Sequence, residues 1–270
     1  TATYRVTEDS PLKIGGAQLN QRLQRDQERY SNVYLDIMGL IALGRYQPGD
    51  RLPTHEQLQK IYNVSIDTTV KAIKILKDWG VVSAAPRNGI CVKMGLKELQ
   101  KIPIEPELIA CHVRRYLDSL ELLSLTIKGV AAHAAFYVTE EEAKGLYRIM
   151  VYQGEEPYQH HLIPRTLLDF IVEHIRYEAL KSIYQVIQQN YRIGRSIPKL
   201  VSRDKTPEGI AIYQHCLETV KLLIKGDRQQ FAQQSAEIFA RTEEIIISEC
   251  KRLGYWEPSL QVYSGMALWK

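Results

Sequence analysis

The 270-residue sequence is poor in cysteine, with four residues, and it contains no long apolar run. The cysteines Cys91, Cys111, Cys216 and Cys250 lie far apart and form no C-x-x-C pair, which argues against a disulfide framework and a cysteine zinc site. No stretch approaches the roughly 18 consecutive apolar residues of a transmembrane helix. The first residues also lack the apolar region of a signal peptide. We therefore expect a cytoplasmic protein.

Excess charge and enzyme motifs are scarce as well. The sequence has 35 Lys and Arg against 31 Asp and Glu, a net charge of +4, which excludes a polybasic protein that coats nucleic acid but permits a local basic patch. The motifs G-x-x-x-x-G-K-[ST], G-x-G-x-x-G, G-x-S-x-G and H-E-x-x-H do not occur. We expect that the protein is not an enzyme.

The sequence does contain the pattern of a small winged helix-turn-helix domain at residues 31–95. Apolar residues recur at helical spacing after residue 31, and two further helices are predicted over 54–62 and 66–79. Strand-like segments at 81–85 and 90–93 flank a Pro- and Gly-containing turn. The order of three helices and a hairpin within about 60 residues is the plan of a winged helix.

Local capping signals support the second and third of these helices. Thr54 is followed three residues later by Gln57, which is the capping-box pattern. Gly80 follows the third helix at the position that glycine favours after a helix end. The side chains of the second helix that we expect to face inward are Leu58, Ile61 and Tyr62.

The remainder of the sequence divides by composition. Residues 1–30 are polar and are interpreted as an N-terminal arm or linker, and residues 96–106 as an interdomain linker. Residues 107–255 show helical spacing throughout and predict an all-helical bundle of six or seven helices, followed by a C-terminal tail at 256–270. The expected fold class is mainly α (α+β overall).

The segment Gly44–Thr54, which reads GRYQPGDRLPT, carries a family resemblance that extends over residues 33–93. The sequence resembles the GntR family of bacterial transcription regulators. Further matching positions are Leu58, Val64, Ser65, Thr68, Ala72, Ile73, Leu76 and Gly89. The resemblance implies a bacterial homodimer that binds double-stranded operator DNA through the winged helix.

Under this resemblance, residues 66–79 form the recognition helix. One face is expected in the core, and the opposite face presents two lysines a single turn apart, Lys71 and Lys74, which can reach phosphates. Thr68 can bind a base edge or a phosphate, and the turn between the strands can enter the minor groove. The expected core residues are Thr69, Ala72, Ile73 and Leu76. The candidate DNA-binding residues are Arg51, Thr54, Ser65, Asp67, Thr68, Lys71, Lys74, Arg87 and Asn88.

Three positions depart from the family pattern. Glu56, Ile66 and Val70 stand where family members commonly have arginines, whose bidentate donors lysine does not replace. Residues 31–95 still hold eight Lys or Arg and five Asp or Glu, a net charge of +3. The alternative is a ligand-binding or protein-interaction module whose degenerate winged helix binds DNA weakly or not at all by itself.

Residues 1–7, which read TATYRVT, resemble the closing wing strand of another such domain. One hypothesis from this resemblance is that the natural chain carries an upstream second winged helix. The alternative is an ordinary N-terminal arm.

The helical segment is similar in length and helix pattern to the FadR type of C-terminal domain. That resemblance implies a small-molecule effector, and in some relatives a divalent metal held by one Asp and three His. The effector-pocket candidates are Asp169, Glu173, His215 and Glu237, an incomplete version of that set. The alternatives are solvated carboxylates with a packing histidine, or an apolar pocket in which some of the 16 tyrosines supply hydroxyl groups. Ligand binding would alter the spacing of two recognition helices and so their fit to DNA.

Overall fold

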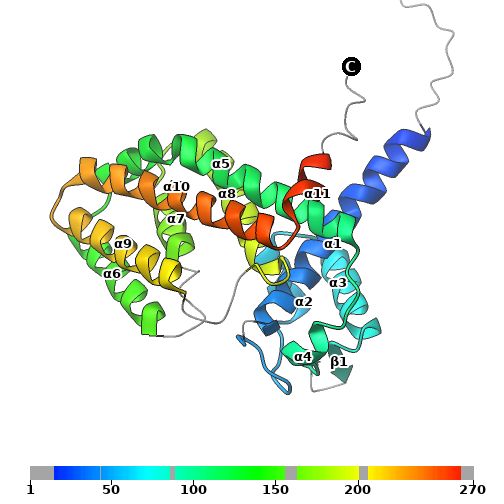
Figure 1. Cartoon of the computed structure of the whole chain (residues 1–270). Coiled ribbons are helices and arrows are strands. Elements are labelled where there is room, and N and C mark those ends of the chain that lie inside the picture. Colours follow the sequence, from blue (N-terminus) through cyan, green and yellow to red (C-terminus); the bar gives the residue numbers. More distant parts are fainter. Residues whose placement is uncertain (1–14, 43, 86–88, 156–162, 201–205, 263–270) are drawn as a thin grey trace, which may run out of the picture.

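The computed structural model describes residues 15–42, 44–85, 89–155, 163–200 and 206–262. A winged helix-turn-helix unit, at the lower right of Figure 1, is joined to a larger group of helices. This is the fold class expected from the sequence. Within the described ranges, none of the helices combines the length and the apolar character needed to cross a bilayer.

The winged helix contains three helices and a hairpin, as predicted. The elements are α1 (Gly15–Ala42), α2 (His55–Tyr62), α3 (Ile66–Asp78), β1 (Val82–Ala85) and β2 (Gly89–Val92). The strands are antiparallel, with Val82 opposite Val92. Gly80 has a φ of 74°, a conformation that glycine adopts without steric cost, so the chain turns directly from α3 into β1.

Helix α1 begins far earlier than the predicted domain boundary. Residues 15–30 belong to the same helix as the buried residues that follow, although the sequence suggested an arm. The segment contains no proline and many helix-favouring residues, so nothing in it ends the helix. Its N-terminal turns project away from the body of the protein (Figure 1).

The predicted linker at residues 96–106 is largely part of the winged-helix unit. It contains a short helix, α4 (Leu96–Leu99), whose Leu99 is buried in the winged-helix core. Ile102 and Ile104 pack against the same core. The prolines and charges of the segment suggested a linker, but its regularly spaced apolar residues bury area against the domain.

Six longer helices form the helical part, followed by one short helix. They are α5 (Pro106–Phe136), α6 (Glu140–Glu155), α7 (Ile163–Glu173), α8 (Glu178–Tyr191), α9 (Pro207–Ile224), α10 (Arg228–Arg252) and α11 (Trp256–Gln261). A 3-10 helix, η2 (Arg192–Ser196), extends α8. Helices α5 and α10 lie side by side, as do α6 and α9 (Figure 1). Helix α11 packs on α5, in a segment that the sequence suggested was a tail.

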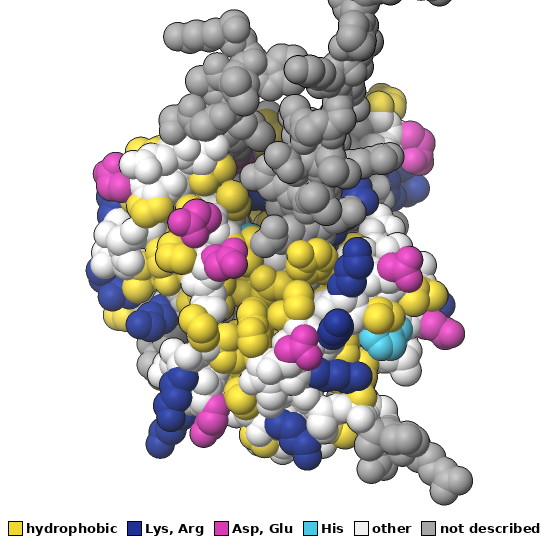
Figure 2. All heavy atoms as spheres, turned by 90° about the vertical axis from the view of Figure 1, so that its right-hand side faces the viewer, with side chains coloured by type: hydrophobic (Ala, Val, Ile, Leu, Met, Phe, Trp, Pro, Cys, Tyr) yellow, Lys and Arg dark blue, Asp and Glu magenta, His cyan; other side chains and the backbone are white. Residues whose placement is uncertain are grey.

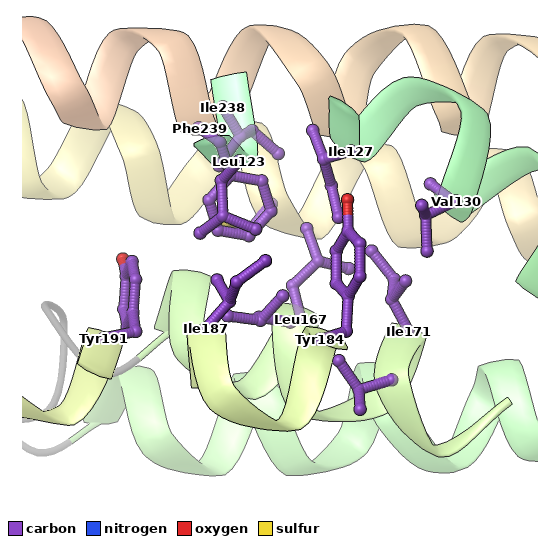
Figure 3. Close-up of a cluster of buried hydrophobic side chains, with 14 of the residues drawn as sticks. Leu123, Ile127, Val130, Leu167, Ile171, Tyr184, Ile187, Tyr191, Ile238 and Phe239 are labelled. Atoms are coloured by element: carbon purple, nitrogen blue, oxygen red, sulfur yellow. The ribbon is translucent and has the colours of Figure 1, made fainter. Parts of the chain in front are cut away.

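The core of the helical part is formed by side chains from α5, α7, α8 and α10 (Figure 3). Leu123, Ile127 and Phe239 meet Leu167 and Ile187 in its centre, all almost completely buried. The apolar helix faces that could have lined a pocket therefore pack against one another here.

Ile61, which was predicted to face inward, and two apolar residues at helical spacing in α8 lie on the surface. Ile61 is 43% exposed and Ile183 is 56% exposed, and Ala179 is also exposed. Helical spacing in the sequence continues through Leu168, Ile171, Ala179, Ile183 and Ile187, but the helix breaks between Glu173 and Glu178. The break rotates the α8 face relative to α7, which moves Ala179 and Ile183 out of the core.

Candidate nucleic-acid interface

The turn between α2 and α3 is built by local hydrogen bonds. The Gln57 amide donates to Thr54 Oγ1 (3.3 Å) and the Thr54 amide donates to Gln57 Oε1 (2.8 Å), which confirms the predicted capping box. Asn63 ends α2 in the left-handed conformation, at φ 51°. Ser65 caps α3 by accepting from the Thr68 amide (3.2 Å). These caps set the angle at which α3 leaves the turn.

Helix α3 has the two predicted faces. Its buried residues are Thr69, Ala72, Ile73 and Leu76, which confirms the expected core face. Lys71 and Lys74 lie on the opposite side and are exposed, together with Asp67, and Thr68 is half-buried. The helix therefore offers two ammonium groups to solvent while its other side is anchored in the domain.

A contact that the sequence analysis missed holds α2 and α3 together. The Nδ1 atom of His55 lies 3.0 Å from the hydroxyl of Thr69, which itself donates to the Ile66 carbonyl (2.7 Å). A polar residue on the core face of α3 is thus satisfied inside the domain. The sequence T-H-E-Q at residues 54–57 predicts the capping box, but it contains no local signal for the contact between His55 and Thr69.

Arg51 is positioned by the hairpin. Residues 50–52 pair with β2 through Leu52 N to Ile90 O (2.8 Å) and Val92 N to Asp50 O (2.9 Å), and Arg51 forms a bridge with Cys91. Arg51 is exposed beside the wing. The predicted wing residues Arg87 and Asn88 lie outside the described residues.

The structure groups five of the predicted DNA-binding residues on the start and outer face of α3. These are Ser65, Asp67, Thr68, Lys71 and Lys74. The hydroxyls of Thr54, Ser65 and Thr68 already take part in helix caps, including a 2.9 Å contact between Ser65 and Thr68. The two lysines are the members of the group with charge available for phosphates.

All three positions that depart from the family pattern are on the surface. Ile66 is 46% exposed, Val70 is 48% exposed and Glu56 is exposed. Figure 2 shows the side of the molecule on which α1, α3 and β1 lie, where apolar side chains occupy the centre and acidic and basic groups are mixed. This face is therefore not uniformly basic.

Glu56 offers a gain-of-function test. Glu56→Arg replaces an exposed carboxylate in the first turn of α2 by a guanidinium, so we expect duplex DNA to bind about tenfold more tightly, since one phosphate contact adds roughly 1.5 kcal/mol. Fluorescence anisotropy with a labelled duplex measures the change. Glu257→Arg, on α11, makes the same charge change and should leave affinity within about twofold. Equal gains from both variants would contradict a role for position 56.

Three of the four effector-pocket candidates hold local side-chain partners. Asp169 Oδ1 accepts from Gln188 Nε2 (2.6 Å) and Asp169 Oδ2 lies 3.4 Å from Arg165 Nε. His215 is hydrogen-bonded to Gln234, and Glu237 accepts from Gln234 Nε2 (3.1 Å). Glu173 is exposed at the end of α7.

His215 and Glu237 thus share Gln234 as a neighbour, whereas Asp169 belongs to a separate group with Gln188. In the part of the chain that the structure describes, no three His, Cys, Asp or Glu side chains gather as metal ligands would. The four residues are not brought together as one ligand set.

The winged helix is joined to the helical part by a buried ion pair. Asp36 on α1 is almost fully buried and accepts from Arg195 of η2, with an Nη2–Oδ2 distance of 2.7 Å, and from the Tyr62 hydroxyl (2.6 Å). Burial and the Asp36 carboxylate raise the pKa of Tyr62. A Cβ atom at Gly39 would overlap the Arg195 carbonyl, so the close approach of α1 to η2 requires glycine there.

A second contact lies beside this ion pair. Ser31 on α1 is 3.2 Å from Nε2 of the buried His112 on α5. Burial lowers the pKa of His112 to about 3, so this histidine is neutral at physiological pH. Together these contacts hold α1 against both α5 and η2.

Comparison with known proteins identifies the first of the two parts. Residues 29–92 match the family described as bacterial regulatory proteins, gntR family. No curated protein matches the chain.

Among solved structures, Lar, described as controlling expression of the Listeria monocytogenes agr system and mediating virulence, is 18% identical over 81% of this chain and 95% of that chain, with a TM-score of 0.40. E. coli McbR/YncC is 17% identical over 82% of this chain and 98% of its own, with a TM-score of 0.37. A GntR protein of Streptococcus agalactiae is 16% identical over 80% and 99%, with a TM-score of 0.36. The family match and the arrangement of α2, α3 and the hairpin agree: residues 29–92 form a helix-turn-helix domain of the gntR family.

Proposed function

We propose that this protein is a transcription regulator that binds operator DNA through α3 and the wing, and whose DNA affinity responds to a small molecule bound by the helical part. The observation that carries the proposal is the division of α3 into a buried face and an exposed face with Lys71 and Lys74, within a domain that matches the gntR family. An α-helix presented in this way fits the major groove.

The experiment is a binding measurement on the intact chain. A gel shift against promoter DNA of its own operon, at low and at physiological ionic strength, should show a complex that survives excess unrelated duplex. Absence of a complex at low ionic strength would overturn the proposal.

We also propose that two copies bind DNA together, and that α5 and α8 supply the surface on which they meet. Thr126 of α5 and Tyr184 of α8 are 2.6 Å apart at their hydroxyls, which ties the two helices together. Close to this contact lie four exposed apolar side chains: Leu122 (40% exposed), Leu125 (75%), Ile183 (56%) and Val186 (57%). Exposed apolar side chains grouped in this way suit a two-fold contact, in which each residue group meets its own copy.

This dimer contact can be tested with buried charges. Leu125→Glu combined with Val186→Glu places four carboxylates in the two-fold contact, so we expect the dimer dissociation constant to rise at least about tenfold. Sedimentation velocity over a range of concentrations measures it. Tyr152→Glu, a charge at an equally exposed aromatic on α6, is the matched control. A dimer unaffected by the double substitution would place the interface elsewhere.

One observation favours a second candidate function. With Glu56, Ile66 and Val70 exposed, α2 and α3 carry no arginine along the surface that family members use. In this candidate the chain is a ligand-binding or protein-interaction module with a degenerate winged helix. The gel shift decides between the two, because such a module forms no specific complex at low ionic strength.

A further inference from the structure

Three arginine side chains come together where the helical part meets the winged helix. Arg192 and Arg195 are three residues apart in η2, so they lie on the same side of this 3-10 helix. Arg192 Nη1 donates to the Ile61 carbonyl at the end of α2 (3.0 Å), and Arg195 binds Asp36 on α1. Arg165 of α7 joins them through Asp169 and Gln188, since Gln188 lies one turn before Arg192 on α8.

The carboxylates in this group do not balance the guanidinium charges. Asp36 is committed to Arg195 and Tyr62, and Asp169 is shared between Arg165 and Gln188. Among the described residues, two carboxylates thus face three guanidinium groups. Burial, together with the nearby charges of Arg195 and Arg192, lowers the pKa of Arg165 to about 10, which is the direction expected for an excess of positive charge.

Two of the three arginines also have N–H groups that make no hydrogen bond within the described part of the chain. The Nε atoms of Arg165 and Arg192 are shielded from solvent and have no hydrogen-bond partner among the described residues, although Arg165 Nε lies 3.4 Å from Asp169 Oδ2 in an ion pair. The Arg165 side chain is 19% exposed, so its guanidinium group is mostly buried but still lies near solvent. Shielded N–H groups of this kind are costly, and a ligand or ion commonly satisfies them.

We propose that Arg165 and Arg192 bind an oxyanion, the carboxylate or phosphate group of a small molecule, at the junction between the helical part and the winged helix. The planar fork of a guanidinium matches both kinds of oxyanion. The anion supplies the missing negative charge and accepts from the unused N–H groups. Because Arg192 also holds the Ile61 carbonyl of α2, the anion fixes the winged helix relative to the helical part. This regulatory consequence rests on the proposed function, whereas anion binding itself does not.

The test measures thermal unfolding of the full chain against concentration of inorganic phosphate or citrate, at constant pH and ionic strength maintained with chloride. An anion that binds only the folded state raises the Tm in proportion to the logarithm of its concentration once that concentration exceeds the Kd. We expect this dependence with at least one of the two probes. A response to phosphate alone indicates a phosphate-bearing ligand, and a response to citrate alone indicates a carboxylate. A response to both indicates a site that binds either kind of oxyanion.

Arg165→Met separates a ligand site from a structural role. Methionine fills similar space without charge, so the variant should be at least as stable as wild type without anion, and the logarithmic part of the Tm shift should disappear. Both probes also stabilise proteins non-specifically, and that component remains in the variant. Arg165→Lys keeps the charge but loses the fork, and should weaken anion binding at least about tenfold. Arg148→Ala, at an exposed arginine on α6, should retain the full response.

The proposal is overturned if wild type shows no logarithmic Tm shift with either probe, or if Arg165→Met keeps the shift. Isothermal titration calorimetry gives the same comparison at one temperature if Arg165→Met proves unstable, with Arg192→Gln as the second variant. Neither measurement uses DNA. Anion binding without DNA binding would therefore leave this site in place and overturn the proposed function alone.

Discussion

Asp36→Ala is expected to destabilise the protein by about 3–5 kcal/mol, the usual cost of removing one member of a buried ion pair. The substitution leaves the Arg195 guanidinium buried without its carboxylate and removes the acceptor of the Tyr62 hydroxyl. Both losses fall at the contact between α1 and η2, so the winged helix loses its main polar attachment to the helical part. Urea unfolding monitored by circular dichroism measures the change.

Controls separate the ion pair from a general effect of losing an aspartate. Asp78→Ala removes an exposed aspartate from the end of α3 and should change stability by less than about 0.5 kcal/mol. Asp36→Ala combined with Arg195→Met should recover part of the loss, because the orphaned charge is gone. Equal stability of Asp36→Ala and Asp78→Ala would show that the ion pair contributes nothing to folding.

The double substitution Lys71→Ala and Lys74→Ala should lower DNA affinity on the order of 100-fold. Each lysine contributes one charge-assisted contact of about 1.5 kcal/mol, and the two lie a single turn apart on the exposed face of α3. Removing two phosphate contacts should also reduce the slope of log affinity against log salt by about 2. Anisotropy titrations at several salt concentrations measure both quantities.

A matched pair of substitutions makes the same change in net charge far from α3. Lys225→Ala and Arg148→Ala remove two exposed basic groups from the helical part and should leave the affinity and the salt slope within error of wild type. If both double variants lower affinity alike, DNA is held by overall charge and not by α3.

Local sequence signals were enough to predict the elements of the winged helix. The capping box at Thr54, the glycine after α3 and the core face through Ala72 and Leu76 were all predicted, because each depends on neighbours within a few residues. Ile61 was assigned inward by periodicity alone and is exposed, since α2 is so short that neighbouring elements decide which of its sides is covered.

The residues of the candidate sites also divide into those that local spacing predicts and those that only tertiary packing brings together. Lys71 and Lys74 were found from helical spacing, and their exposure opposite the core face followed from the same period. His55 was missed, because its contact with Thr69 depends on how α2 packs on α3. Asp169 was taken as an effector-pocket candidate from the resemblance to the FadR type of C-terminal domain, but only the packing of α7 on α8 and η2 places it next to Arg165 and Gln188.

The sequence by itself determined the winged helix, the turn between α2 and α3 and the two faces of α3, because short-range hydrogen bonds and apolar spacing specify these elements. Only the tertiary structure decided how that domain is attached. Asp36 and Arg195 are 159 residues apart in the chain, and neither carries a local signal of its partner. The grouping of the three arginines was not predictable for the same reason. From the sequence alone, a charged side chain on a helix is expected to be solvated, and only the packing of other helices shows that water is excluded around it.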